Sequence, residues 1–308
     1  MDTEEEFDWA APRSREADAV TAIAMLPDAH ARLTSLGVMP TYLVDYPIAN
    51  NPASAAVLAS FVADGNAVVG AQLHPWVNPP LDEVMSNANS FVGNLPEAQE
   101  RAKLAVLSER IMTAIGVRPQ VYRAGRYGVG PNSARLLIDQ GYRLDVSIRS
   151  LFDYRSDGGP DFSAYPNWPW WVDGGQRLLE LPLTAAYTGA LRHHGAALFP
   201  RSAGLPLARG LLARAGLLQR VALTPEGMPL RDVLAALEIL VGEGMGLFSL
   251  SFHSPSLRPG NTPYVRDAAE LRLFWNWWHG VLDFFARHGI ANASPIELIA
   301  AADRGRSI

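Results

Sequence analysis

The sequence alternates short apolar runs, typical of buried strands, with longer segments of helical periodicity. Gly37 ends the first helical segment, and Pro52 and Pro295 stand where later ones begin. Strands that alternate with helices in this way pair in parallel through βα units, so the pattern predicts an α/β fold. We expect strands at residues 39–45, 67–73, 120–123, 144–148, 178–183 and 246–252, and helices at residues 17–36, 53–63, 97–115, 132–140, 230–243 and 268–288.

Length and composition set outer limits on the fold and on the partners. A chain of 308 residues with 48% hydrophobic residues can bury a substantial core, either as one α/β barrel or as two smaller domains. The formal net charge of -5, with Lys and Arg scattered, argues against nucleic acid as a partner. Because the chain has no Cys, disulfides and thiolate zinc sites are excluded, and any metal must be held by His, carboxylate or amide groups.

The sequence also bears on localisation. No run approaches 18 apolar residues, so we expect no membrane span. The acidic start, residues 1–6, is unlike a secretory signal. These features predict a soluble, cytoplasmic protein.

Polar side chains stand where two of the expected strands end. His74 and Asn78 follow the strand at residues 67–73, in a segment whose prolines rule out a regular helix. His253 follows the strand at residues 246–252. Barrel enzymes place catalytic groups at such strand exits. The alternative for His74 taken alone is a surface histidine in a proline-rich loop.

The first residues are densely acidic. If they are extended, Asp2, Glu4 and Glu6 point to one face, while Thr3 and Glu5 point to the other. Two carboxylates could then converge on a site. The alternative is an exposed, solvated tail, which is what most terminal acidic runs are.

The helix–strand rhythm breaks at a long excursion over about residues 151–177, which is rich in aromatic and turn residues. Loops of this length are uncommon unless they serve as lids or binding walls. Trp168, Trp170 and Trp171 could stack on sugar faces, and packing beneath the loop is the alternative. A further stretch, about residues 184–230, is an expected insertion without a sharp chemical signal.

The order of motifs resembles the polysaccharide deacetylase family, with its NodB homology fold, also grouped as carbohydrate esterase family four. Residues 2–4 (Asp-Thr-Glu) resemble its acidic motif, and residues 65–78 resemble its His-x-x-x-His metal motif. Residues 122–128 and 141–147 resemble the third and fourth motifs, and residues 250–253 resemble the fifth, a strand that ends in His. The stretches at residues 2–9, 74–76 and 252–257 further resemble a bacterial branch of the family whose name carries no substrate.

This resemblance implies one distorted (β/α) barrel domain over residues 1–308 and metal-assisted removal of acetyl groups from an N-acetylated saccharide or glycoconjugate. It makes Asp2 the general base, and Glu4, or Asp2 itself, the carboxylate ligand of a divalent metal, zinc or another ion. His74 is the second ligand, and Asn78 stands where a second His normally binds. The other implied roles belong to Arg123, which orients the base, the backbone N–H of Tyr127, which polarises the carbonyl, His253, which protonates the leaving amine, and Trp76, Arg126, Trp168, Trp170 and Trp171, which bind substrate.

Asn78 departs from the family pattern. A neutral amide is a poor zinc ligand beside imidazole, so the site should hold zinc weakly, prefer a harder ion or hold none. Two functions follow as alternatives: a metal-dependent deacetylase, or a carbohydrate-binding pseudoenzyme of the same fold with a degraded metal site. A third interpretation is that these are ordinary polar residues at loop ends.

The position of the acidic motif adds one more expectation. In the family this motif lies at the carboxyl end of the first barrel strand, but here only Met1 precedes Asp2. We therefore expect the first strand to be truncated.

Overall fold

A mostly parallel sheet forms the centre of the computed structural model, which describes residues 1–202, 205 and 207–305. The strand order in this seven-stranded sheet is β1-β2-β3-β4-β5-β7-β6. Neighbours from β1 to β7 are parallel, whereas β6 is antiparallel to β7. The predicted α/β class is therefore confirmed. The strands are β1 (Asp2–Thr3), β2 (Thr41–Val44), β3 (Val68–Leu73), β4 (Val121–Ala124), β5 (Leu144–Asp145), β6 (Trp170–Trp171) and β7 (Leu179–Glu180).

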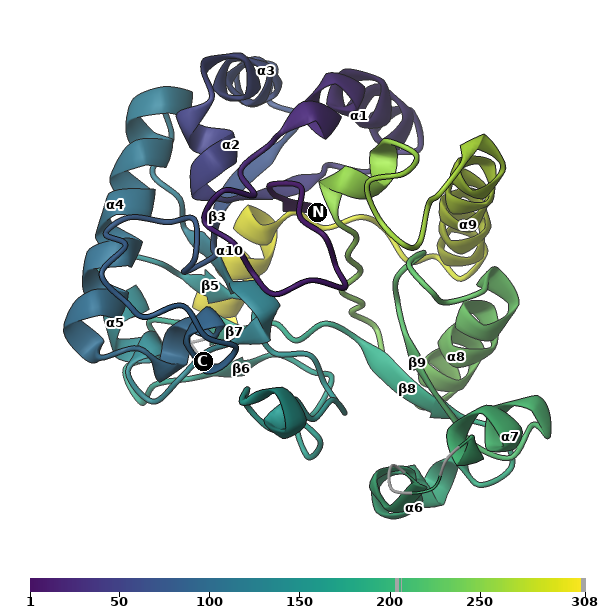
Figure 1. Cartoon of the computed structure of the whole chain (residues 1–308). Helices are drawn as coiled ribbons and strands as arrows, with labels where there is room; N and C mark the ends of the chain where they lie inside the picture. Colours follow the sequence, from purple (N-terminus) through teal and green to yellow (C-terminus); the bar gives the residue numbers. More distant parts are fainter. Residues whose placement is uncertain (203–204, 206, 306–308) are drawn as a thin grey trace.

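Helices surround this sheet (Figure 1). Side-chain caps fix where several begin: Asn51 accepts hydrogen bonds from the first backbone N–H groups of α3, and Asp267 does the same for α9. Helix α4 ends at Gly116, which takes the left-handed conformation that stops a helix. The helices are α1 (Leu26–Ser35), α2 (Tyr46–Asn50), α3 (Pro52–Ala63), α4 (Glu97–Ile115), α5 (Ser133–Asp139), α6 (Gly195–Arg201), α7 (Ala208–Arg214), α8 (Leu230–Gly242), α9 (Ala268–Arg287) and α10 (Pro295–Gly305).

A gap in the ring of strands separates β1 from a second, antiparallel sheet of β8 (Ala185–Thr188) and β9 (Gln219–Ala222). Residues 246–252 run through this gap. The sequence predicts a strand there, which is wrong: the segment makes single backbone hydrogen bonds, such as Asp2 N–H to the Phe252 carbonyl at 2.8 Å. Asp2 and His253 form an isolated parallel bridge on that side rather than a ladder. The result is a distorted barrel, as the family resemblance implies, and it is incompletely closed at this seam.

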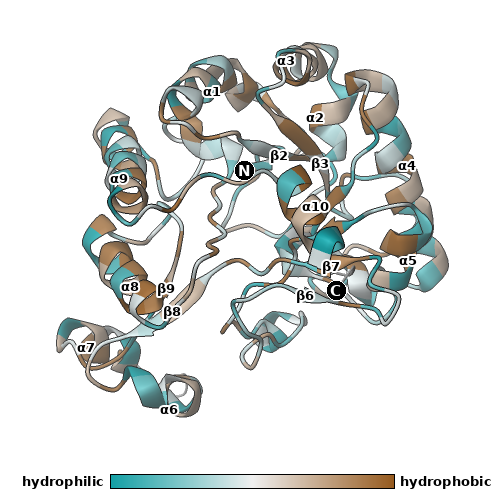
Figure 2. Ribbon diagram, turned by 180° about the vertical axis from the view of Figure 1, so that it is seen from behind, coloured by the Kyte–Doolittle hydropathy of each residue, from teal (hydrophilic) through white to brown (hydrophobic). Residues whose placement is uncertain are grey.

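Helix α10 covers one end of this barrel. Its Ile299 packs against Leu43, Val121 and Leu144, which point into the barrel from β2, β4 and β5. Figure 2, which looks from behind, shows α10 lying across the strands. The opposite end, where the carboxyl ends of the parallel strands meet, is left for a site. Among the described residues, no helix combines the length and apolarity needed to cross a bilayer.

The proline-rich segment after β3 is held in place by Lys103 of α4. The Lys103 side chain is fully buried, and its ammonium donates to the backbone carbonyls of Pro75, Asn78 and Pro80. It also forms an ion pair with Glu83 at 2.9 Å. One cation thus replaces the regular hydrogen bonds that the prolines cannot make.

Replacing Lys103 with Met should therefore destabilise the fold. The substitution leaves a buried carboxylate and three carbonyls without their donor, and breaking a buried ion pair from one side costs about 3–5 kcal/mol. Urea denaturation of Lys103→Met should show a lower midpoint at an unchanged slope. Arg101→Met is the matched control because Arg101 lies on the same helix, and its ion pairs with Glu97 and Asp139 are exposed. Equal losses in the two variants would contradict this account of Lys103.

Candidate functional site

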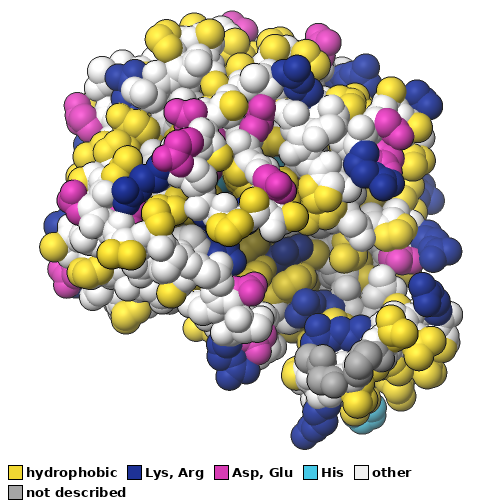
Figure 3. All heavy atoms as spheres, in the orientation of Figure 1, with side chains coloured by type: hydrophobic (Ala, Val, Ile, Leu, Met, Phe, Trp, Pro, Cys, Tyr) yellow, Lys and Arg dark blue, Asp and Glu magenta, His cyan; other side chains and the backbone are white. Residues whose placement is uncertain are grey.

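A cavity of about 200 Å³ opens at the carboxyl ends of β1, β3 and β4. Figure 3 looks onto this end of the molecule, where side chains surround a hollow near the centre. The cavity combines buried carboxylates, two histidines and several aromatic rings. The lining includes Asp2, Glu4, Phe7, Trp9, Arg13, Gln72, His74, Trp76, Arg123, Arg126, Tyr127, Arg149, Tyr154, Glu226, His253 and Tyr264.

Asp2 lies at the floor of the cavity between two cationic side chains. Its Oδ2 is 3.1 Å from Nη1 of Arg123 and 3.6 Å from Nε2 of His253. Burial would raise the pKa of Asp2, but the positive charges around it, chiefly those of Arg123 and His253, lower it by more. This pKa therefore lies below its ordinary value. Asp2 is therefore held as a carboxylate.

His253 is held from behind by Glu226, which follows β9. Glu226 accepts hydrogen bonds from the backbone N–H of His253 at 3.1 Å and from Ser256, and its Oε2 lies 2.6 Å from Nδ1 of His253. Burial would lower the pKa of His253, but Glu226 and then Glu4 raise it to about 10. The imidazole is therefore a cation at neutral pH, with Nε2 directed toward Asp2.

A second group comprises Glu4, Gln72 and His74. Nε2 of Gln72 lies 2.9 Å from Oε2 of Glu4 and 3.1 Å from Nε2 of His74, and these last two atoms are 3.6 Å apart. Oε1 of Glu4 and Oε1 of Gln72 are buried without a hydrogen-bond partner, as is Oδ1 of nearby Asp2. Burial raises the pKa of Glu4 to about 8, against the lowering by His253 and His74. Buried oxygens without donors are what a cation site requires.

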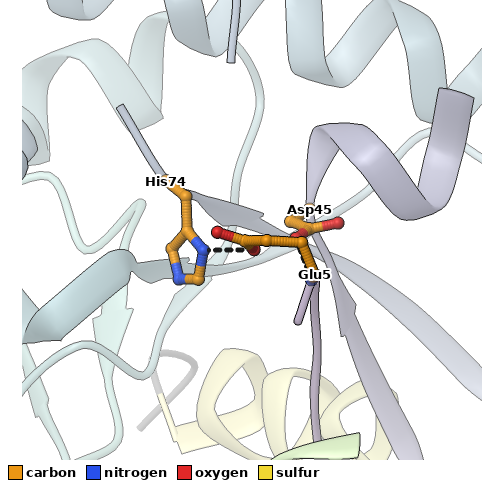
Figure 4. Close-up of side chains that lie close together, drawn as sticks. All are labelled: Glu5, Asp45 and His74. Carbon is orange, nitrogen blue, oxygen red and sulfur yellow. Dashed lines mark hydrogen bonds and ion pairs between the residues drawn. The ribbon is translucent and has the colours of Figure 1, made fainter. Parts of the chain in front are cut away.

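A cluster of Glu5, Asp45 and His74 lies beside this group, with ligand atoms within 4.8 Å of one another (Figure 4). Its oxygens already have donors. Glu5 accepts from Nε1 of Trp76 and faces Nδ1 of His74 at 2.7 Å, and Asp45 accepts from the backbone N–H groups of Glu5 and Ile48. The cluster is thus a hydrogen-bond network that orients His74, and burial lowers the pKa of His74, which favours the neutral ring.

Asn78, expected as a third metal ligand, is not brought to the cavity. Its Nδ2 donates to the carbonyls of Pro79 and Lys103, at 2.8 and 2.9 Å, although its Oδ1 is buried without a partner. The reason is the Lys103 anchor described above, which fixes the backbone of this segment against α4. Asp2, Glu4 and His74 line one cavity, whereas Asn78 lies outside its lining.

Arg126 and Tyr127 lie in the turn after β4, and both have positive φ. Gly125 begins this turn, and a Cβ there would lie 2.3 Å from Cδ2 of His74, so only glycine allows the turn to pack on that ring. Tyr127 lines the cavity with its ring against Arg123 and Arg149. Arg126 also lines it and donates to Asn87 at 2.7 Å.

The expected tryptophan wall is placed differently. Trp168 is 68% exposed, and Trp170 and Trp171 form β6 at the edge of the sheet, all outside the cavity lining. The reason is that β6 pairs with β7 and draws the excursion toward the sheet edge. Trp76 does line the cavity, stacked on His74 with ring centroids 4.3 Å apart. The other aromatic lining residues are Phe7, Trp9, Tyr127, Tyr154 and Tyr264.

Sequence reasoning missed Glu226, Gln72 and the lining residues Phe7, Trp9, Arg13, Arg149, Tyr154 and Tyr264 as members of the site. Glu226 follows a strand, and a polar residue at a strand exit is the signal that could have identified it. Gln72 lies inside a buried strand, where an amide between apolar neighbours is the corresponding signal.

Comparison with known proteins identifies the fold. No family model matches the sequence, and no curated protein matches it. The structure is similar to that of a protein from Mycobacterium smegmatis described as a polysaccharide deacetylase, with 20% identity and a TM-score of 0.57 over 92% of this chain and 79% of that one. It is also similar to Puue allantoinase, with 15% identity and a TM-score of 0.51 over 91% of this chain and 71% of that one. The chain thus has a polysaccharide deacetylase-like fold, as its motifs predict.

The pairing of His253 with Glu226 has a measurable consequence. In Glu226→Gln the pKa of His253 should fall toward its ordinary value of 6.5 because the nearest negative charge is removed. NMR titration of the imidazole measures this directly. Since the folded pKa lies above the unfolded one, the pair stabilises the fold below about pH 6.5, and this stabilisation is lost as the pH rises through about 10.

The melting temperatures of wild type and Glu226→Gln should accordingly differ most at low pH and converge in alkali. Glu238→Gln is the control, since Glu238 is an exposed partner of another histidine, His288, at 3.8 Å. A His253 pKa that is the same in wild type and Glu226→Gln would contradict the assignment.

Proposed function

We propose that this chain is a hydrolase that removes acetyl groups from an N-acetylated saccharide or glycoconjugate with the help of a divalent metal ion. The observation that carries the proposal is the row of charges Arg123, Asp2, His253 and Glu226 beside Glu4 and His74 in one cavity. Amide hydrolysis needs a base for water, an acid for the leaving amine and an electrophile at the carbonyl. The deacetylase-like fold supports this choice of reaction.

Asp2 is the proposed base. The Arg123 ion pair keeps it ionised at neutral pH and orients Oδ2, while Oδ1 is buried and lacks a hydrogen-bond partner. Oδ1 is thus available to accept a proton from a water molecule in the cavity. A carboxylate held in this way needs no reorganisation before the proton transfer.

His253 is the proposed acid. Its Nδ1 is held by Glu226, which leaves Nε2 to carry the proton that faces the cavity. Because Glu226 and Glu4 keep the pKa of His253 near 10, the imidazolium is present throughout the neutral range. It can therefore donate to the amine nitrogen as the C–N bond breaks.

The residues present fit a divalent cation, since Glu4 and Gln72 each carry a buried oxygen without a partner, and Nε2 of His74 lies 3.6 Å from Oε2 of Glu4 and 3.1 Å from Nε2 of Gln72. Glu4 and His74 would hold the ion. When bound, it acts as a Lewis acid that activates water and polarises the acyl carbonyl. The backbone N–H of Tyr127 is the proposed additional donor to that carbonyl oxygen.

The saccharide would lie against the aromatic walls of the cavity. Trp9 packs edge-on against both His253 and Tyr264, with ring centroids 4.9 and 5.6 Å apart. Trp76 and Arg126 belong to the same lining, so they remain proposed substrate contacts. Flat rings beside polar groups suit a sugar, which presents apolar faces and hydroxyl edges.

A second function, carbohydrate binding without turnover, is favoured by the placement of Asn78 outside the cavity, because the ligand set implied by the family is then incomplete. Sugar binding with no acetate release would support this alternative. Stoichiometric metal with acetate release would support the enzyme.

In the enzyme, His253→Ala should lower kcat by about 10²–10⁴-fold, since the leaving amine loses its proton donor. The assay is acetate release from acetylated chito-oligosaccharides, with metal content measured on the same samples. Metal content should change little in His253→Ala. The control is His279→Ala, an exposed histidine on α9, which should keep full turnover. Unchanged turnover in His253→Ala would make His253 a structural histidine.

A further inference from the structure

We propose that Gln72, through Oε1, is the third protein ligand of a divalent cation bound by Glu4 and His74. This assignment deepens the proposed function and rests on it for the role of the ion, but metal binding tests it separately from turnover. It replaces Asn78, the residue that the sequence places third, with a residue from inside β3.

The first support is geometric. The amide nitrogen Nε2 of Gln72 lies 2.9 Å from Oε2 of Glu4 and 3.1 Å from Nε2 of His74, and those two atoms are 3.6 Å apart. With metal–ligand bonds of about 2.0–2.2 Å, neighbouring donors of one ion lie about 2.8–3.6 Å apart in octahedral or tetrahedral geometry. The three side chains therefore already stand at the spacing of a coordination shell.

The second support is the amide itself. A rotation of 180° about the terminal side-chain torsion exchanges the positions of Nε2 and Oε1 of Gln72. The oxygen then lies where Nε2 now lies, next to Glu4 and His74. In the present orientation Oε1 is buried and without a partner, although the side chain is 2% exposed. Without an ion, the NH₂ group donates to Glu4 and His74. With an ion, the oxygen takes that place, so the amide has one orientation for each state.

The backbone explains why Gln72 rather than Asn78 can serve. Gln72 and His74 are two residues apart at the end of β3, so their side chains project to the same side. Nδ2 of Asn78 is instead committed to the carbonyls of Pro79 and Lys103. A ligand on a strand is also held more rigidly than one in a loop.

The donor set defines the class of ion. One imidazole nitrogen, one carboxylate and one amide oxygen make a harder site than two histidines and a carboxylate, and they suit first-row divalent ions such as Mn²⁺ or Co²⁺ as well as zinc. His74 is prepared for this role because Glu5 holds Nδ1 and leaves the Nε2 lone pair free for the ion.

The test is titration of the metal-stripped full chain with Co²⁺, followed by its visible absorption and by calorimetry. Wild type should bind one ion. Gln72→Ala should bind at least 10-fold more weakly, Gln72→Glu should restore affinity through its carboxylate oxygen, and Asn78→Ala should bind as wild type does. Melting curves of the metal-free variants show whether each is folded. If Gln72→Ala does not fold, the comparison of Gln72→Glu with wild type still tests the assignment.

Equal affinity of wild type and Gln72→Ala for Co²⁺ overturns the assignment, and so does weaker binding by Asn78→Ala than by Gln72→Ala. A wild type that binds no Co²⁺ at 1 mM, roughly the weakest specific range for such sites, also overturns it. The acetate assay separates this result from the proposed function. Metal binding that depends on Gln72, in a protein that releases no acetate, upholds the site and refutes the deacetylase. Acetate release by a wild type that binds no Co²⁺ refutes the site and leaves a metal-independent hydrolase standing.

Discussion

The burial of three acidic side chains within the first five residues constrains the rest of the structure. Asp2, Glu4 and Glu5 are each no more than 2% exposed, and a buried carboxylate is costly unless donors or cations surround it. Each is served by a different strand or loop: Asp2 by Arg123 of β4, Glu4 by Gln72 of β3, and Glu5 by His74 and Trp76 after β3. The strands must therefore keep this order and register for the acidic segment to be buried at all.

Two histidines in the same cavity have different charge states because their surroundings differ. His253 has a carboxylate behind it and negative groups before it, so its pKa rises, whereas burial dominates at His74 and lowers its pKa. Glu5, which backs His74, is itself shifted upward by burial, so it stabilises a positive ring less than Glu226 does. One ring thus suits proton donation and the other suits metal ligation, which is the separation of roles that a hydrolytic site needs.

The sequence predicts the fold better than it predicts which residues make up the site. The mostly apolar run at residues 67–73 identifies β3, because parallel strands covered on both faces are rich in apolar residues. The run does not show which side of β3 faces the cavity, so the role of its one amide, Gln72, is not evident from the sequence. Asn78 could not be placed because its orientation depends on the carbonyl of Lys103, a contact between distant parts of the chain. The segment at residues 246–252 resembles a strand in composition, but its backbone makes single hydrogen bonds to separate neighbours, such as Ser251 N–H to the Leu223 carbonyl and Asp2 N–H to the Phe252 carbonyl.

The seam of the barrel sets the relation between the proposed base and acid. Asp2 and His253 are direct partners in an isolated parallel bridge, and the backbone N–H of Asp2 donates to the Phe252 carbonyl. Their side chains therefore start from adjacent backbone positions, and on the other side Asp2 is in register with Leu43 of β2. Main-chain hydrogen bonds fix positions more rigidly than contacts between side chains, whose rotamers can change. The incomplete closure of the barrel at this seam thus leaves room for a cavity while a single bridge still holds the two charged groups 3.6 Å apart.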